Sequence, residues 1–184
     1  AIDPVHPALV EACRLWWEKS IRVSTVARIL ARRSERLDPE QLALSGLLHA
    51  IGEIVIIGYA FRFPEVIDSG ELHAFLDASS AEVGRVLLTL WGFQHHQIEI
   101  IADSADWFRD ADKDITELDI VLVARALVGE AMNQASTPDP KTLPAYRKLG
   151  LLEASADTHA KLEYAAQFAS EEALKQLSEF ASPR

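Results

Sequence analysis

The feature that most constrains the fold of this chain is an almost uninterrupted apolar segment at residues 42–57. A helix-start signal precedes it, because Asp38 can cap the first turn, Pro39 suits the first helical position and Gln41 can close a capping box. The apolar side chains would cover nearly the whole circumference of a helix, which indicates burial on most sides. We therefore expect a central hydrophobic helix at about residues 39–57.

The interior of this segment holds two glycines and two ionisable side chains. Gly46 and Gly52 would each destabilise a helix by roughly 0.5–1 kcal/mol relative to alanine, so we expect a neighbouring backbone to approach closely at both. The most apolar part, residues 47–61, is interrupted by His49 and Glu53 and is shorter than the about 20 apolar residues that cross a bilayer. This pattern predicts a core helix and no membrane partner.

The rest of the 184-residue chain reads as a series of amphipathic helices. Glycine and proline number only 8 each and 49% of the residues are hydrophobic, which favours helices and supplies enough apolar surface for a core. The expected fold class is all-α, a multi-helix bundle around the central helix, with residues 1–184 as a single domain. Ser79 and Asp114 are expected to cap two of the helices. Besides the central helix, the pattern predicts helices at about 7–36, 71–77, 79–91, 94–107, 114–134, 145–152 and 157–180, with loops at 64–70 and 136–144.

Charge and cysteine content limit the expected partners and compartment. The chain has 18 Lys and Arg against 28 Asp and Glu, and its formal net charge of −10 opposes binding to the phosphate backbone of nucleic acids. The single cysteine, Cys13, cannot form an internal disulfide, so nothing indicates an oxidising compartment. We expect a cytoplasmic protein that does not bind nucleic acid.

Residues 46–52 read Gly-Leu-Leu-His-Ala-Ile-Gly. This segment and three others resemble motifs of the HDOD family, the HD-related output domains of bacterial signalling proteins. It matches six of the seven positions of the family's Gly-Leu-Leu-His-Asp-Ile-Gly. About 30 residues later, the Ala-Glu-Val-Gly and Trp-Gly run at residues 81–92 is similar to a second family motif. Residues 16–20 and 149–151 are weaker matches, to the family's Trp-x-His-Ser entry and to a late Leu-Gly-Leu. The resemblance covers about residues 15–174.

This resemblance implies descent from HD-type phosphohydrolases, whose helical fold holds divalent metal through several His and Asp ligands. A catalytic divalent ion needs several oxygen or imidazole ligands and an open position for water. Of the family's ligand positions, the chain keeps His49. The other positions carry different residues: Lys19 at the entry His, Ala50 at the carboxylate, Ser80 at a common His, Asp103 and Ser104 near a His pair, and Arg125 at the late Asp. Because two of these replacements are cations, we expect the site to repel a metal ion, and we predict no catalysis, metal or cofactor.

The histidine that remains, His49, has two interpretations. It can be a neutral core residue that is hydrogen-bonded to a neighbouring group, because an unpaired buried polar group would cost about 1–3 kcal/mol. Alternatively, it lines a remnant pocket with Lys19 and Arg125 that holds an anion or a phosphorylated small molecule.

Two further sets of residues suggest sites: a rival metal site outside the His49 region, and a charged surface that could bind a partner. His95, Glu99 and Asp103 recur at four-residue steps, a spacing that can chelate but is more often a solvated stripe. An acidic run and an arginine stripe could bind a protein partner or support self-association. The residues proposed for this surface are Asp103, Asp106, Asp110 and Asp112 in the run and Arg28, Arg32 and Arg36 in the stripe.

The four tryptophans are expected mostly in the core. Trp16 lies on an apolar stripe and Trp91 closes a helix, whereas Trp17 and Trp107 could be exposed and would then mark an interface.

Taken together, the motifs predict a catalytically inactive signal-transduction output or protein-interaction module of a bacterial regulatory protein. The alternatives are a small-ligand sensor that binds a nucleotide or anion in the remnant pocket, and a metal-dependent phosphohydrolase with unconventional ligands. Family members usually carry a further helical half before the Trp-x-His-Ser entry. The chain is expected to lack it, either as a fragment or as a shortened member whose apolar surface a partner or second copy covers.

Overall fold

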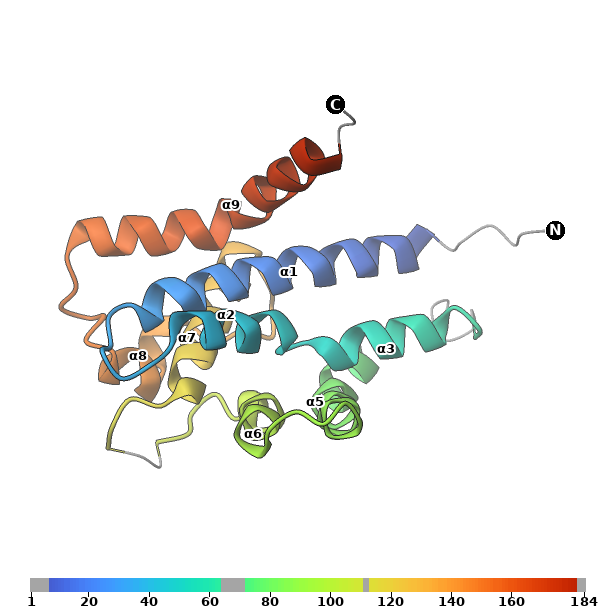
Figure 1. Cartoon of the computed structure of the whole chain (residues 1–184), viewed down its shortest axis with the longest axis horizontal. Helices are drawn as coiled ribbons and strands as arrows, with labels where there is room; N and C mark the ends of the chain where they lie inside the picture. The colour runs from blue at the N-terminus through green and yellow to red at the C-terminus, as the bar shows by residue number, and fades with distance from the viewer. Residues whose placement is uncertain (1–6, 64–71, 111–112, 182–184) are drawn as a thin grey trace. The chain divides into compact units, whose positions relative to one another are not determined.

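The computed structural model describes residues 7–63, 72–110 and 113–181, and for His73 and residues 170–181 only the backbone is described. In these ranges the chain forms helices and short 3₁₀ turns and no strand, which confirms the expected all-α fold (Figure 1). The helices are α1 (Pro7–Ala31), α2 (Pro39–Leu48), α3 (Ile51–Ala60), α5 (Leu72–Leu90), α6 (His95–Ala102), α7 (Glu117–Ala131), α8 (Pro144–Lys148) and α9 (Ala156–Ala181), with 3₁₀ turns η1 (Asp103–Ala105) and η2 (Pro140–Thr142).

The chain divides into two compact units, each of which is described by itself. Unit 1 takes Ala1–Glu18 and Leu48–Ala105, and unit 2 takes Lys19–Leu47 and Asp106–Arg184. The single domain expected over residues 1–184 stays a prediction.

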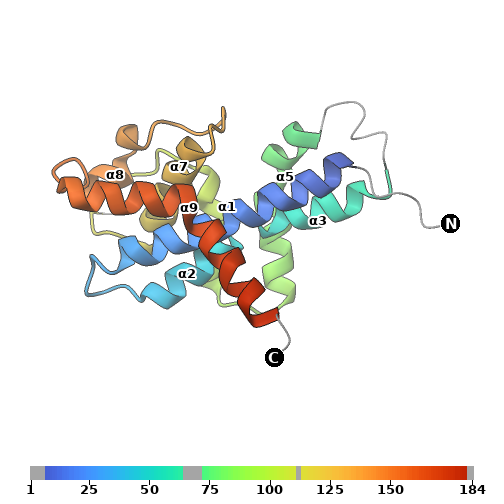
Figure 2. The same cartoon turned by 90° about the horizontal axis from the view of Figure 1, so that it is seen from above.

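Unit 1 is built on the packing of α3 against α5 (Figure 2). Helix α6 lies beside α5 (Figure 1). Its core joins side chains from the start of α1, from α3 and from α5, and half-buried Trp16 and Val83 pack around it. The buried members of this core are Leu9, Ile56, Ile57, Ala60, Leu72 and Leu76.

The glycine at the start of α3 allows α3 and α5 to approach closely. A Cβ atom placed on Gly52 would lie 1.9 Å from the Ser80 carbonyl oxygen and 2.8 Å from the Gly84 amide nitrogen. In unit 2, Gly46 allows α2 and α1 to approach closely, because a Cβ atom placed on it would lie 2.8 Å from Cα of Ser24 on α1. Both close approaches predicted from the sequence are therefore confirmed.

Unit 2 is organised around α7, which packs against α8 and α9. Ten of its fifteen residues are buried, as expected for a helix that is apolar on nearly every face. Its start lies at Thr116 and not at Asp114, because Thr116 and Asp119 form a capping box. The Asp119 amide donates to the Thr116 hydroxyl at 3.2 Å, and the Thr116 amide donates to the Asp119 carboxylate at 2.8 Å.

The central helix predicted at residues 39–57 is interrupted. It forms two helices, α2 and α3, separated by a turn at residues 49–50. Ala50 has φ −115° and ψ 25°, outside the helical range, and its carbonyl accepts a hydrogen bond from the Trp16 indole at 2.7 Å. The same carbonyl accepts a hydrogen bond from the Glu53 amide. This bond closes a tight first turn, at which α3 begins.

Other helix boundaries also differ from the sequence prediction. The helices predicted at 71–77 and 79–91 are one continuous helix, α5, so Ser79 lies inside it and does not cap a helix. Nothing in this stretch breaks a helix, because it holds good helix formers and no proline. The helix ends as predicted before Gly92, whose φ of +74° suits glycine. The first helix ends at Ala31, about a turn before the predicted Arg36. The loop predicted at 64–70 lies outside the described residues.

Taken as one stretch, Pro39–Ala60 is long and apolar enough to cross a membrane. Half of its most apolar window is buried inside the protein. A buried core helix passes the same test, so this is weak evidence for a membrane span.

Candidate functional site

The histidine of the family motif, His49, lies in the turn between α2 and α3 and is 6% exposed. Ala50 beside it is buried, and Ser80 lies half-buried on α5. The structure thus brings these three of the predicted site residues into unit 1, and it places Lys19 and Arg125 in unit 2.

The indole of Trp16 holds the turn that carries His49. Its Nε1 donates to the Ala50 carbonyl at 2.7 Å across 34 positions of sequence. Ala50 stands where the resemblance implies a metal-binding carboxylate, so a residue just before the Trp-x-His-Ser match, whose tryptophan is Trp17, fixes the backbone of the Gly-Leu-Leu-His motif.

Replacing this indole with a phenyl ring should loosen the turn. We expect Trp16→Phe to lower the free energy of unfolding by about 1–2 kcal/mol, because the carbonyl of buried Ala50 loses one of its two donors. The measurement is urea unfolding followed by far-UV circular dichroism. Trp17→Phe is the matched control and should change stability by less than about 0.5 kcal/mol, because Trp17 is 37% exposed. Equal losses in the two variants would show that the hydrogen bond has no special role.

The cation that replaces the family's late Asp, Arg125, lies over an aromatic ring. Its guanidinium carbon is 4.4 Å from the ring centroid of Trp107, a cation–π contact within unit 2. Both side chains are half-buried, as is Lys19. Sequence reasoning left Trp107 as a residue that could be exposed and did not anticipate its arginine partner.

The rival metal site lies on an exposed surface. His95 Nε2 is 3.1 Å from Glu99 Oε1, and the two side chains are 86% and 58% exposed. Asp103 follows the end of α6 and opens η1, so it does not continue the helical stripe. Among the residues whose side chains the structure describes, 7–63, 72, 74–110 and 113–169, no three His, Cys, Asp or Glu residues are arranged to hold a metal ion.

The charged residues proposed as an interaction surface are partly engaged within unit 2. Arg28 pairs with Glu40 at 2.7 Å, and Lys148 lies 3.7 Å from Asp110. Asp106, Arg32 and Arg36 are exposed, Asp103 belongs to unit 1, and Asp112 lies outside the described residues.

Trp91 differs from its expected core position. It is 57% exposed at the end of α5, beside Leu90 at 77%. Its partner is Phe93, with ring centroids 6.5 Å apart. Cys13 is half-buried, and burial raises the pKa of its thiol above the ordinary value.

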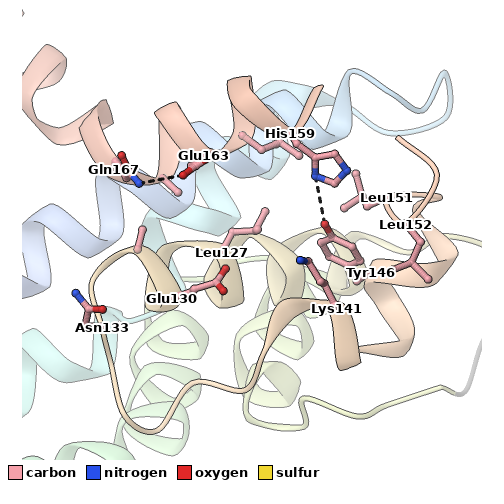
Figure 3. A pocket seen from close by; sticks show the side chains of 13 residues that line it. Leu127, Glu130, Asn133, Lys141, Tyr146, Leu151, Leu152, His159, Glu163 and Gln167 are labelled. Atoms are coloured by element: carbon pink, nitrogen blue, oxygen red, sulfur yellow. Dashed lines mark hydrogen bonds between the residues drawn. The ribbon is translucent and has the colours of Figure 1, made fainter. Parts of the chain in front are cut away.

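Sequence reasoning missed a groove in unit 2. It has a volume of about 840 Å³ and lies between α7 and α9, with η2 and α8 closing one end (Figure 3). No sequence motif marks it, because its lining is spread over residues 127–167.

Comparison with known proteins gives one family and one fold. The HDOD domain model matches residues 4–106, more than half of the chain. A crystal structure of a proposed metal-dependent phosphohydrolase from Shewanella amazonensis SB2B has a similar fold, with a TM-score of 0.68 and 20% sequence identity over 91% of this chain. This chain covers 62% of that protein, which is less than two thirds of its length. No curated protein matches the chain. On the strength of the domain match, whose residues include both of the specific motifs, this chain belongs to the HDOD family.

Proposed function

We propose that this HDOD domain is catalytically inactive and acts as a protein-interaction module in a bacterial signalling pathway of the cytoplasm. The observation that carries the proposal is the residue set at the family's metal positions, where His49 is followed by Ala50 and two other positions carry Lys19 and Arg125. One imidazole does not hold a divalent ion in a catalytic geometry, and an ammonium or a guanidinium at a ligand position has no lone pair to offer a metal.

The surroundings of these residues support the same proposal. Arg125 is engaged with Trp107, and His49 is 6% exposed. The guanidinium of Arg125 already has an aromatic partner, so we do not propose an anion pocket around it. An interaction role is supported by Leu90 and Trp91, since exposed large apolar side chains are typical of protein interfaces.

A phosphodiesterase assay tests the loss of catalysis. The purified chain is incubated with bis(p-nitrophenyl) phosphate and with cyclic dinucleotides, each in the presence of Mn²⁺ or Mg²⁺. We expect rates equal to those of the buffer and equal rates for His49→Ala. Hydrolysis that His49→Ala abolishes would contradict the proposal.

A further inference from the structure

The groove between α7 and α9 has no role in the function proposed from the HDOD motifs. Its volume of about 840 Å³ falls in the range of 300–1,000 Å³ that is typical of small-molecule sites. All of its lining residues belong to unit 2, whereas the family's histidine is in unit 1.

The floor of the groove is apolar. Leu151 and Leu162 are buried at 0% and 2% exposure, and half-buried Leu127 lies between the two walls (Figure 3). Burying an apolar ligand surface on such a floor is favourable by roughly 25 cal/mol per Å² of apolar surface removed from water. The ligand should therefore carry an apolar body.

The groove lining holds two carboxylates and one ammonium, and the Arg22 guanidinium donates to the carbonyl of the lining residue Ala166 at 3.4 Å. Glu163 on α9 and Glu130 on α7 come from opposite walls and are both exposed (Figure 3). Asp139 caps η2 nearby, where its carboxylate accepts from the Lys141 amide at 2.9 Å. The ammonium of Lys141 also lines the groove and offsets part of this negative charge.

The phenol of Tyr146 senses this negative potential. Burial raises its pKa, and the charges of Glu130 and Asp139 raise it further, so the hydroxyl keeps its proton at neutral pH. The hydroxyl oxygen lies 3.5 Å from His159 Nδ1, which places two hydrogen-bonding groups at one end of the groove (Figure 3).

From the negative rim and the apolar floor, we propose that this groove binds a small organic amine. The ammonium group would lie between Glu130 and Glu163, and the apolar body would lie on the floor of leucines. An organic acid of the same shape would meet an excess of carboxylates, and a neutral analogue would bring no charge to pair with them, although Glu163 already accepts a hydrogen bond from Gln167 at 3.4 Å. This binding activity is separate from the proposed interaction role and stands independently of it.

Calorimetric titration of the full chain with three probes of matched shape tests the ligand class. The probes are 2-phenylethylamine, 3-phenylpropionate and 2-phenylethanol. We expect saturable binding of the amine, with an affinity about 5-fold or more above that of the other two, since a partly exposed ion pair is worth up to about 1 kcal/mol. Binding of the acid as tight as that of the amine would overturn the proposal. No saturable binding of the amine up to about 10 mM would also overturn it, because a dissociation constant of about 10 mM corresponds to a binding free energy of less than about 3 kcal/mol.

Variants at the rim test the location. Glu130→Gln and Glu163→Gln should each weaken amine binding about 2- to 5-fold, and together about 10-fold. Lys141→Gln should leave amine binding equal or tighter, because it removes a like charge. Glu35→Gln, an exposed change in unit 2 outside the groove lining, is the matched control and should have no effect. Circular dichroism checks that each variant is folded. An amine affinity that is unchanged in the folded double variant would overturn the proposal.

Discussion

Gly52→Ala is expected to lower the free energy of unfolding by about 3 kcal/mol or more. The added Cβ would lie 1.9 Å from the Ser80 carbonyl oxygen and 2.8 Å from both the Ser80 carbonyl carbon and the Gly84 nitrogen. All three are backbone atoms, so no side chain can rotate away and α3 must move off α5. That movement would open the apolar core of unit 1, where Ile56 and Ile57 are buried.

Gly58→Ala is the matched control, because it adds the same atom to the same helix. A Cβ on Gly58 has no neighbour within 4 Å, so alanine should stabilise α3 by roughly 0.5–1 kcal/mol through its higher helix propensity. Urea unfolding of both variants, followed by far-UV circular dichroism, measures the difference. A loss of no more than about 1 kcal/mol in the free energy of unfolding of Gly52→Ala would contradict the close contact between α3 and α5.

Asp119→Ala is expected to be the second most destabilising change, by about 2–4 kcal/mol. The Asp119 side chain is 5% exposed and accepts hydrogen bonds from the Thr116 amide at 2.8 Å and the Thr116 hydroxyl at 2.9 Å. It also pairs with Lys148 at 3.3 Å. Alanine would remove the half of the capping box that the Asp119 carboxylate supplies. It would also leave the mostly buried Lys148 ammonium with only the longer contact to Asp110.

The control for this prediction is the residue that the sequence pattern favoured as the cap. Asp114 is exposed, so Asp114→Ala should change stability by less than about 0.5 kcal/mol. Thermal unfolding of the two variants under identical conditions compares the two caps. A larger loss for Asp114→Ala than for Asp119→Ala would support the start at Asp114 and contradict the observed capping box.

The all-helical fold and the two close glycine contacts follow from local sequence signals. Periodicity and the scarcity of breakers indicate helices, and a glycine inside an apolar helix indicates a neighbouring backbone. The break at residues 49–50 could not be predicted in this way, because its cause is a hydrogen bond from Trp16, which is 34 positions away. The continuity of α5 past Ser79 shows the opposite error, since a capping residue does not stop a helix that good helix formers continue.

The candidate site was predictable to the extent that motifs mark it. The Gly-Leu-Leu-His segment locates His49, and the family resemblance supplies the positions of Lys19 and Arg125. The contact of Arg125 with Trp107 was not predictable, because neither residue belongs to a local pattern that includes the other. The groove in unit 2 was missed for the same reason, since its walls come from α7 and α9 and meet only through tertiary packing.

The most direct test of the central claim, that the family's metal site is lost, is a calorimetric titration of the whole chain with Mn²⁺. We predict no binding tighter than a dissociation constant of about 1 mM, which corresponds to about −4 kcal/mol, and identical heats for the chain and for His49→Ala. Binding of one Mn²⁺ per chain at micromolar concentration, lost in His49→Ala, would contradict the claim.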